Sequence, residues 1–234
     1  MHFELHSETD LRRLTGFPNG YPRGHPVAGY SQIPVIDGVK LDSAPSDLVA
    51  FDDRGRALNP AKTGIHFYRE DRKFDSVLQN PLPWVEKFMH FSVVLTPDVT
   101  LTDDMPSWLR QARTCLSRAV GVVFQVRGIP VVPSLRWRAL EDLTFVTAGI
   151  QTDSTIALSN YGARRDHREK FIFREGAEIV LELLKPRIVF LYGSLDEELA
   201  KLFDSHVDLH VYSSPTARRI PAQSSSHTQG LSLF

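Results

Sequence analysis

The 234-residue sequence contains a single cysteine, Cys115. One thiol can form neither an internal disulfide nor the thiolate cluster of a structural zinc site. Cys115 lies within the apolar stripe of a predicted helix, so we interpret it as a core thiol and not as a nucleophile. A reducing cytoplasm is therefore the expected location of the protein.

The sequence also lacks long hydrophobic runs and a large net charge. No apolar run approaches the roughly 18 residues of a transmembrane helix, so no membrane association is expected. The 27 Lys and Arg residues are balanced by 28 Asp and Glu residues, and the formal charge is -1. This balance disfavours a strongly basic protein that coats a nucleic-acid duplex, although it leaves room for a local basic patch.

Two glycine-rich phosphate-binding motifs are absent as well. There is no G-x-G-x-x-G after the first predicted strand, and no G-x-x-x-x-G-K-[ST] anywhere in the chain. Dinucleotide-binding and P-loop NTPase functions therefore lose their usual support in the sequence.

What the sequence does contain is an alternation of short β-branched runs with helical segments. This alternation predicts an α/β fold of about six strand–helix units, with mostly parallel strands and right-handed crossovers. A barrel-like, incomplete TIM-type sheet is favoured because polar residues follow nearly every strand, and an open doubly wound Rossmann-like sheet is the alternative. The expected strands are Gly64–Tyr68, Phe91–Leu95, Ile129–Pro133, Thr155–Leu158, Ile188–Leu191 and Asp208–Tyr212.

The two ends of the chain differ in composition from its middle. Glycine and proline recur throughout residues 1–38, which predicts an irregular arm. Residues 215–234 have almost nothing to bury, which predicts a disordered tail. Residues 39–214 are then expected to form a single α/β domain.

Three carboxylates are candidate catalytic residues. Asp98 directly follows the second predicted strand, where it could serve as a general base, a nucleophile or a metal ligand. Glu70 ends the first strand and could join Asp98 in acid–base chemistry or in binding a divalent cation such as Mg²⁺ or Mn²⁺. Asp104, beside Asp103, favours a helix start but could reach the site. The structural alternatives are a loop cap for Asp98 and an exposed surface position for Glu70.

Arg136 and Trp137 follow the third predicted strand. A guanidinium group at this position could hold a phosphate or carboxylate, and the indole could stack on a base or sugar. In the alternative interpretation, Arg136 pairs internally with Asp98 and Trp137 fills the top of the core. The adjoining Arg138 is expected to face solvent.

A second polar cluster follows the fourth predicted strand. Ser159, Asn160 and Gly162 could form an anion cradle from backbone N–H groups and a hydroxyl, with Arg168 adding positive charge. An ordinary glycine turn before a solvated helix is the alternative. Tyr192, after the fifth strand, is a further candidate for lining the pocket.

Several of these short sequence segments, in their order and spacing, resemble those of a family of uncharacterised proteins (DUF4417-like) found in phages, prophages, plasmids and other mobile elements. The likeness covers roughly residues 33–214 and implies one coherent domain in a mobile-element setting, without an assigned activity. Relatives often have phenylalanine after the Pro-Asp pair, where this chain has Val99. The matching segments are Thr96-Pro97-Asp98, Asp104-Met105-Pro106, residues 128–133, Arg136-Trp137, residues 154–159 with Gly162, Arg168, and Leu184-Lys185-Pro186 ahead of Tyr192-Gly193.

Taken together, the candidates predict an enzyme acting on a phosphate-bearing substrate, either a nucleotide or a nucleic-acid end. Asp98 would be the base or a metal ligand, and Arg136 with residues 159–168 would hold the anion. One alternative is a non-catalytic module that binds a nucleotide or nucleic acid, and another is a sugar-acting hydrolase using Asp98 and Glu70. The sequence carries no signal for an oligomeric state.

Overall fold

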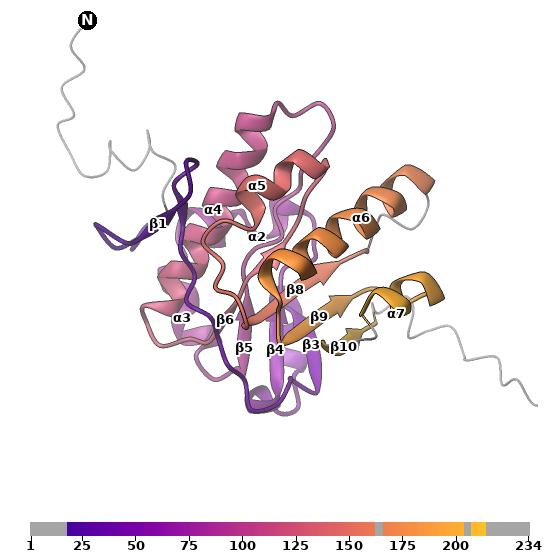
Figure 1. Ribbon diagram of the computed structural model, residues 1–234. Helices are drawn as coiled ribbons and strands as arrows, with labels where there is room; N and C mark the ends of the chain where they lie inside the picture. The colour runs from indigo at the N-terminus through magenta and orange to yellow at the C-terminus, as the bar shows by residue number, and fades with distance from the viewer. Residues whose placement is uncertain (1–17, 162–165, 204–206, 214–234) are drawn as a thin grey trace, which may run out of the picture.

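The strands form two parallel sheets that follow one another in chain order (Figure 1). This computed structural model describes residues 18–161, 166–203 and 207–213. The first sheet contains β3 (Asp47–Ala50), β4 (Thr63–His66), β5 (Val93–Leu95) and β6 (Val131–Val132), and the second contains β7 (Ser134–Leu135), β8 (Thr155–Ser159), β9 (Ile188–Tyr192) and β10 (Asp208–Tyr212). Every pairing within the two sheets is parallel, which confirms the predicted α/β class.

The two sheets meet at Pro133, which separates β6 from β7. Proline has no N–H to donate to a ladder, so a regular strand cannot continue through it. Its carbonyl still accepts from Ala157 N at 2.9 Å, and Ser134 N donates to the Thr96 hydroxyl at 3.0 Å. The expected single strand Ile129–Pro133 is thus replaced by two short strands, one paired with β5 and the other with β8.

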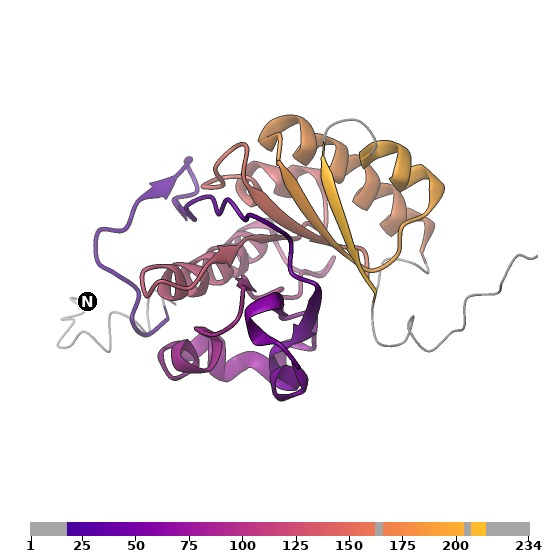
Figure 2. The same cartoon turned by 90° about the horizontal axis from the view of Figure 1, so that it is seen from below.

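Helices cover one face of the strands. Side chains of α2, α3 and α4 pack on β4, β5 and β6, and those of α5, α6 and α7 pack on β7, β8 and β9. Figure 2 shows α6 and α7 lying over the outer face of the second sheet. The helices are α2 (Asp71–Gln79), α3 (Leu82–Phe88), α4 (Ser107–Gln125), α5 (Leu143–Val146), α6 (His167–Leu184) and α7 (Glu197–Phe203).

The opposite face carries a core of its own. Side chains alternate between the two faces of a strand, so Val189 and Leu191 of β9 face the helices, while Phe190 and Tyr192 face inward. The inward cluster draws on both sheets, as the interior of a barrel does. Its buried members are Leu48, Tyr68, Val93, Leu95, Val132, Ala157, Ile188, Phe190, Tyr192 and Tyr212.

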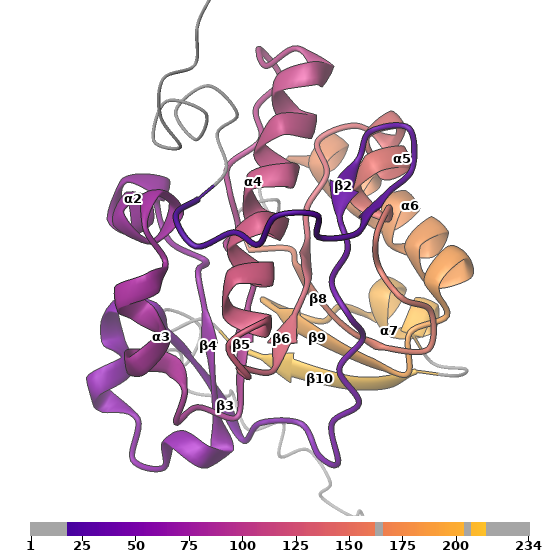
Figure 3. The same cartoon turned by 90° about the vertical axis from the view of Figure 1, so that its left-hand side faces the viewer.

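This arrangement matches the barrel-like sheet that the sequence favours. A doubly wound sheet places helices on both faces and reverses its strand order at a switch point, whereas here the order does not reverse (Figure 3). The barrel is incomplete, because β3 and β10 do not pair through backbone hydrogen bonds in the described part of the chain. The Tyr212 hydroxyl donates to the Pro45 carbonyl at 2.8 Å and links these two edges.

Residues 18–38 of the expected arm include a short hairpin, β1 (Val27–Ala28) with β2 (Ile33–Pro34). Ile33 and Ile36 are fully buried, and Ile36 forms a parallel bridge with Ile150. Residues 1–17 and the predicted tail at 215–234 lie outside the described residues. In the described ranges, no helix combines the length and the apolar character needed to cross a bilayer.

Gly176 allows α6 to approach the loop after β7. A Cβ at this position would overlap the Trp137 indole nitrogen, so only glycine leaves room for the ring. We expect Gly176→Ala to lower stability by about 1–3 kcal/mol through overpacking, a fall in Tm of roughly 2–12 °C. Thermal unfolding followed by circular dichroism measures this loss. Gly55→Ala is the control, because a Cβ there meets open space; equal stability of the two variants would contradict the packing argument.

Candidate functional site

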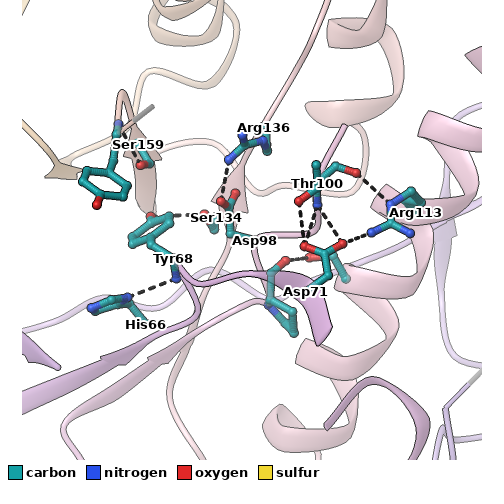
Figure 4. A network of polar contacts seen from close by, with 12 residues as sticks. His66, Tyr68, Asp71, Asp98, Thr100, Arg113, Ser134, Arg136 and Ser159 are labelled. Carbon is teal, nitrogen blue, oxygen red and sulfur yellow. Dashed lines mark hydrogen bonds and ion pairs between the residues drawn. The ribbon is translucent and has the colours of Figure 1, made fainter. Parts of the chain in front are cut away.

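An ion pair at the carboxyl ends of β5 and β7 lies at the centre of the candidate site. Arg136 Nη1 donates to Asp98 Oδ2 at 2.6 Å, as Figure 4 shows. Asp98 is buried, with 8% of its surface exposed, whereas 37% of the Arg136 side chain is exposed. The internal pairing considered from the sequence is therefore present, and it leaves part of the guanidinium accessible to a ligand.

The environment of Asp98 changes its acidity. Burial raises the pKa of Asp98 above its ordinary value, because removal from water disfavours the charged form. Arg136 opposes this effect but does not cancel it, and the negative charge of Asp71 raises the pKa further. Asp98 therefore takes up a proton at a higher pH than an ordinary aspartate, and protonation weakens its hold on Arg136.

A cavity of about 440 Å³ opens beside the ion pair. It combines guanidinium, carboxylate and hydroxyl groups with aromatic and aliphatic walls, the mixture expected of a small-molecule site. Three residues singled out from the sequence, Arg136, Trp137 and Ser159, meet in its lining. The full lining is Leu101, Thr102, Asp103, Leu135, Arg136, Trp137, Arg138, Ser159, Tyr161, Glu169, Ile172 and Phe173.

The aromatic residues that line the cavity differ in the solvent exposure of their rings. Trp137 is buried, its indole N–H donates to the Ile172 carbonyl at 3.0 Å, and its ring stacks on Phe173 at 5.6 Å. Tyr161 is 47% exposed at the rim, so its ring offers more free surface to a ligand. Tyr161 adjoins the polar cluster that follows β8, and this position in the sequence could have identified it as a residue of the site.

Arg138 forms a second charged group in the cavity lining. It donates two hydrogen bonds to the Asp103 carboxylate, at 2.7 and 2.6 Å, and one to Glu169 at 2.5 Å. These carboxylates raise the pKa of Arg138, and they hold its side chain in a largely covered position. The expectation of a solvent-facing Arg138 is therefore wrong, because two acids from distant segments converge on it. Arg168 lies 3.9 Å from Asp103 and is mostly exposed.

A buried ion pair supports the loop that carries Arg136 and Arg138. Asp142 is fully buried and accepts from Arg110 Nε at 2.9 and 3.0 Å. Its Oδ2 also accepts from the backbone N–H groups of Arg138 and Ala139, at 3.0 and 3.1 Å. Asp142 thus ties the loop to α4. No local sequence pattern indicates this pairing, since Arg110 lies 32 positions earlier.

The polar cluster after β8 is engaged mainly within the protein. The Asn160 side chain donates to the Ser194 carbonyl at 2.7 Å and accepts from the Ser194 N–H at 3.1 Å. Gly193, with φ of 144°, leaves space for this amide. Ser159 Oγ accepts from Tyr161 N at 3.2 Å and lines the cavity. Of the proposed anion cradle, Ser159 faces the cavity, Asn160 joins two strand ends, and Gly162 lies outside the described residues.

Glu70 and Asp104 are not in the cavity lining. Glu70 is exposed and pairs with Arg72 at 2.6 Å, while Asp104 is exposed and accepts from the Thr102 hydroxyl. In each case the neighbouring carboxylate binds an arginine from a more distant segment. Asp103 binds Arg138, and Asp71 binds Arg113 as well as the backbone N–H and hydroxyl of Thr100 (Figure 4).

Tyr192 lies in the barrel interior. Its ring stacks on Tyr68 at 4.5 Å and lies 4.5 Å from the His66 ring. The Tyr68 hydroxyl lies 3.2 Å from the Ser134 hydroxyl, and burial raises the pKa of Tyr68 (Figure 4). These aromatic rings pack in the barrel interior near the carboxyl ends of β4 and β9. Within residues 18–161, 166–203 and 207–213, no three His, Cys, Asp or Glu side chains are grouped to hold a metal ion.

The sequence of the chain is similar to those of a protein family and of phage proteins. The family model described as "Domain of unknown function (DUF4417)" matches residues 25–210. The "Gene 1 protein" of Mycobacterium phage L5 is 28% identical over 66% of this chain and 68% of its own length. The "Gene 1 protein" of Mycobacterium phage D29 is 30% identical over 64% of this chain, and the matched region spans 57% of that protein. No solved structure matches the chain.

Proposed function

Because the chain belongs to the DUF4417 family, whose description names no activity, we propose its function from the geometry of the site. The cavity beside Arg136 binds a phosphate-bearing ligand, either a nucleotide or an end of nucleic acid. The relatives are phage proteins, and the setting we propose is the cytoplasm of a cell that carries a phage or another mobile element.

One observation carries this proposal: a partly exposed guanidinium is fixed by a buried carboxylate at the rim of a cavity. Asp98 occupies one terminal nitrogen of Arg136, so the remaining donors are oriented before a ligand arrives. Arginine suits this role because its planar group donates two parallel hydrogen bonds to a phosphate. Pre-orientation reduces the ordering of side chains that binding otherwise requires.

The other charged side chains in the cavity neutralise one another. Arg138 pairs with Asp103 and Glu169, and Arg168, outside the cavity lining, lies 3.9 Å from Asp103, so this network offers an anion little net attraction. Ser159 adds a hydroxyl, and Tyr161 adds an exposed ring on which a base can stack. We therefore assign the phosphate to Arg136 and the base to the Tyr161 side of the cavity.

The direct test is a thermal-shift screen of the full chain with mononucleotides, oligothymidylate and neutral glycans, each with and without Mg²⁺ or Mn²⁺. A ligand that binds only the folded state stabilises it by RT ln(1 + L/Kd), where L is the free ligand concentration, so Tm rises with that concentration. We expect nucleotides or oligothymidylate to raise Tm and glycans to leave it unchanged. A shift with glycans alone would favour a sugar-binding site instead.

A catalytic role is the second candidate, and the raised pKa of Asp98 favours it. A carboxyl group that exchanges its proton closer to neutral pH is better suited to general acid–base catalysis than an ordinary aspartate. In that case Asp98 would move a proton on a phosphate ester held by Arg136. The enzyme would be a hydrolase or a transferase.

Substitution of Asp98 by asparagine separates binding from catalysis. For a binding site, we expect Asp98→Asn to bind oligothymidylate as tightly as the wild type or more tightly, because a negative charge near the anion is removed. The wild type should bind more tightly as pH falls through the Asp98 pKa, since protonation removes the negative charge near the anion while a carboxyl oxygen can still accept from Arg136, whereas the variant should show no such change. Isothermal titration at several pH values measures both effects. Thymidylate phosphodiesters keep a constant charge over this range.

An enzyme would respond differently to the same substitution. Asp98→Asn would retain the ligand but lose turnover of the phosphate ester. Weaker binding by the variant at all pH values would contradict both assignments, because it would make Asp98 itself a ligand-binding group.

A further inference from the structure

Arg118 of α4 is a buried charge without an opposite charge among the described residues. Only 1% of the residue is exposed. Its guanidinium donates to the Val146 carbonyl at 2.9 Å and to the Ser134 carbonyl at 3.4 Å, while Nε has no hydrogen-bond partner. No carboxylate of the described residues lies within 4.0 Å of this guanidinium. Arg110 and Arg138, by contrast, each form an ion pair with a carboxylate.

Such a charge is unfavourable for folding. Taking a guanidinium out of water without an anion opposes burial, and burial accordingly lowers the pKa of Arg118 to about 9. The group nevertheless stays protonated at neutral pH. A methionine of similar length would fill the same volume without this penalty, so the packing of α4 alone does not account for a charge at this position.

A small polar cavity connects Arg118 with the ion pair of the site. Its volume of about 10 Å³ is close to that needed for one water molecule. Arg118, Asp98 and Arg136 all line it, together with the hydroxyl-bearing Thr114 and Ser117. Asp98 Oδ2 is occupied by Arg136, while Oδ1 accepts no hydrogen bond from a described residue. Among the described residues, Arg118 Nε–H is thus a buried donor without a partner, and Arg118 and Asp98 both line this water-sized cavity.

We propose that Arg118 is a positioning residue of the anion site: it holds a bound water against Asp98 and supplies the unbalanced positive charge beneath Arg136. The water accepts from Nε and donates to Oδ1, which fixes the carboxylate that in turn orients Arg136. The identity of the anionic ligand rests on the proposed function. The bound water and the buried charge of Arg118 do not depend on it.

Three side chains from neighbouring elements act on Asp98 electrostatically. Arg136 faces it from the end of β7, and Asp71 and Tyr68 act on it from the segment after β4. Asp71 is itself paired with Arg113. Two guanidinium groups, those of Arg118 and Arg136, then share one carboxylate, which leaves one positive charge for an anionic ligand to balance.

The test measures Asp98 in the ligand-free protein, by carboxyl-carbon NMR titration of the wild type, Arg118→Met and Arg118→Lys. Removing the charge and the water donor should move the Asp98 titration roughly one pH unit higher in Arg118→Met. Arg118→Lys keeps the charge and should stay near the wild type. An unchanged titration in folded Arg118→Met would overturn the proposal and leave Arg118 with a packing role.

A measurement on the wild type avoids dependence on the folding of a variant. A high-resolution crystal structure of the full chain should show an ordered water within hydrogen-bond distance of both Arg118 Nε and Asp98 Oδ1. An empty cavity would exclude the bridging water. Neither this measurement nor the titration uses a ligand, so both can succeed where the nucleotide screen fails.

The selection of anions is tested separately with inorganic phosphate as the probe. At neutral pH, folded Arg118→Met should bind phosphate several-fold more weakly than the wild type, while Arg118→Lys should bind nearly as tightly. Equal phosphate affinity in the methionine variant and the wild type would overturn the part of the proposal that concerns charge.

Discussion

Replacing Arg136 by methionine is expected to weaken the binding of oligothymidylate by roughly 10- to 150-fold. A hydrogen bond to a charged group contributes about 1.5–3 kcal/mol, and about 1.4 kcal/mol corresponds to a factor of ten in Kd. The variant also leaves the Asp98 carboxylate without its partner at the edge of the cavity, where its negative charge would repel a phosphate. Isothermal titration at neutral pH measures the change.

Arg174→Met is the matched control for Arg136→Met. Arg174 is a partly exposed arginine that is also paired with carboxylates, Glu175 and Glu198, but it lines a different cavity. We expect its substitution to leave the affinity for oligothymidylate within about twofold of the wild type, because it removes the same charge elsewhere on the surface. Equal losses in the two variants would show that binding follows overall charge and not the site.

A double variant separates the two effects of Arg136→Met. Combining it with Asp98→Asn removes the guanidinium and the carboxylate together. Part of the lost affinity should return, because the unpaired negative charge is gone while the missing donor is not replaced. If the double variant binds no better than Arg136→Met alone, then repulsion by Asp98 contributes nothing to the loss.

Replacing Asp142 by alanine is expected to have the largest effect on stability. The substitution leaves Arg110 buried without its partner, a change that typically lowers stability by about 3–5 kcal/mol. For a chain of this length, the fall in Tm is then roughly 6–20 °C. Two backbone N–H groups, those of Arg138 and Ala139, also lose their acceptor, so the loop that carries Arg136 should move and ligand binding should fall as well.

The adjacent Glu141 provides the control for Asp142. Glu141 lies 3.7 Å from the same arginine but is largely exposed, so Glu141→Ala should cost at most about 1 kcal/mol. Asp142→Asn should be intermediate, since an amide oxygen can still accept from the backbone while the charge is lost. Differential scanning calorimetry of the three variants gives the ranking. Similar Tm values for Asp142→Ala and Glu141→Ala would contradict a structural role for the buried pair.

The strand–helix order could be predicted because it depends on local patterns. β10 is observed at the expected residues Asp208–Tyr212, and α4 spans Ser107–Gln125, which contains the Cys115 that the sequence placed in a helix. The barrel-like arrangement was also accessible, since polar residues follow nearly every predicted strand and not one switch point alone. The break at Pro133 was visible in the sequence as a residue without an N–H. Which neighbour each half of that strand would pair with was not.

The candidate site was predictable only in part. Arg136, Trp137 and Ser159 were singled out because they follow strands, and the carboxyl ends of parallel strands lie along one rim. The sequence could not choose between adjacent carboxylates, so Asp104 was preferred to Asp103. Both are equally close to the helix start, and the choice depends on which of them Arg138 reaches from 35 positions away.

The amino-acid sequence by itself determined the parallel α/β class, the order of its elements and the strand ends that carry polar side chains, because periodicity and turn residues act over a few positions. Only the tertiary structure decided which charges pair. The pairs Asp98 with Arg136 and Asp142 with Arg110 are outcomes of packing between distant segments, as is the burial of Arg118 without a carboxylate partner in the described part of the chain. The energy of a buried charge depends on everything within a few ångströms of it, and no local pattern in the chain encodes that neighbourhood.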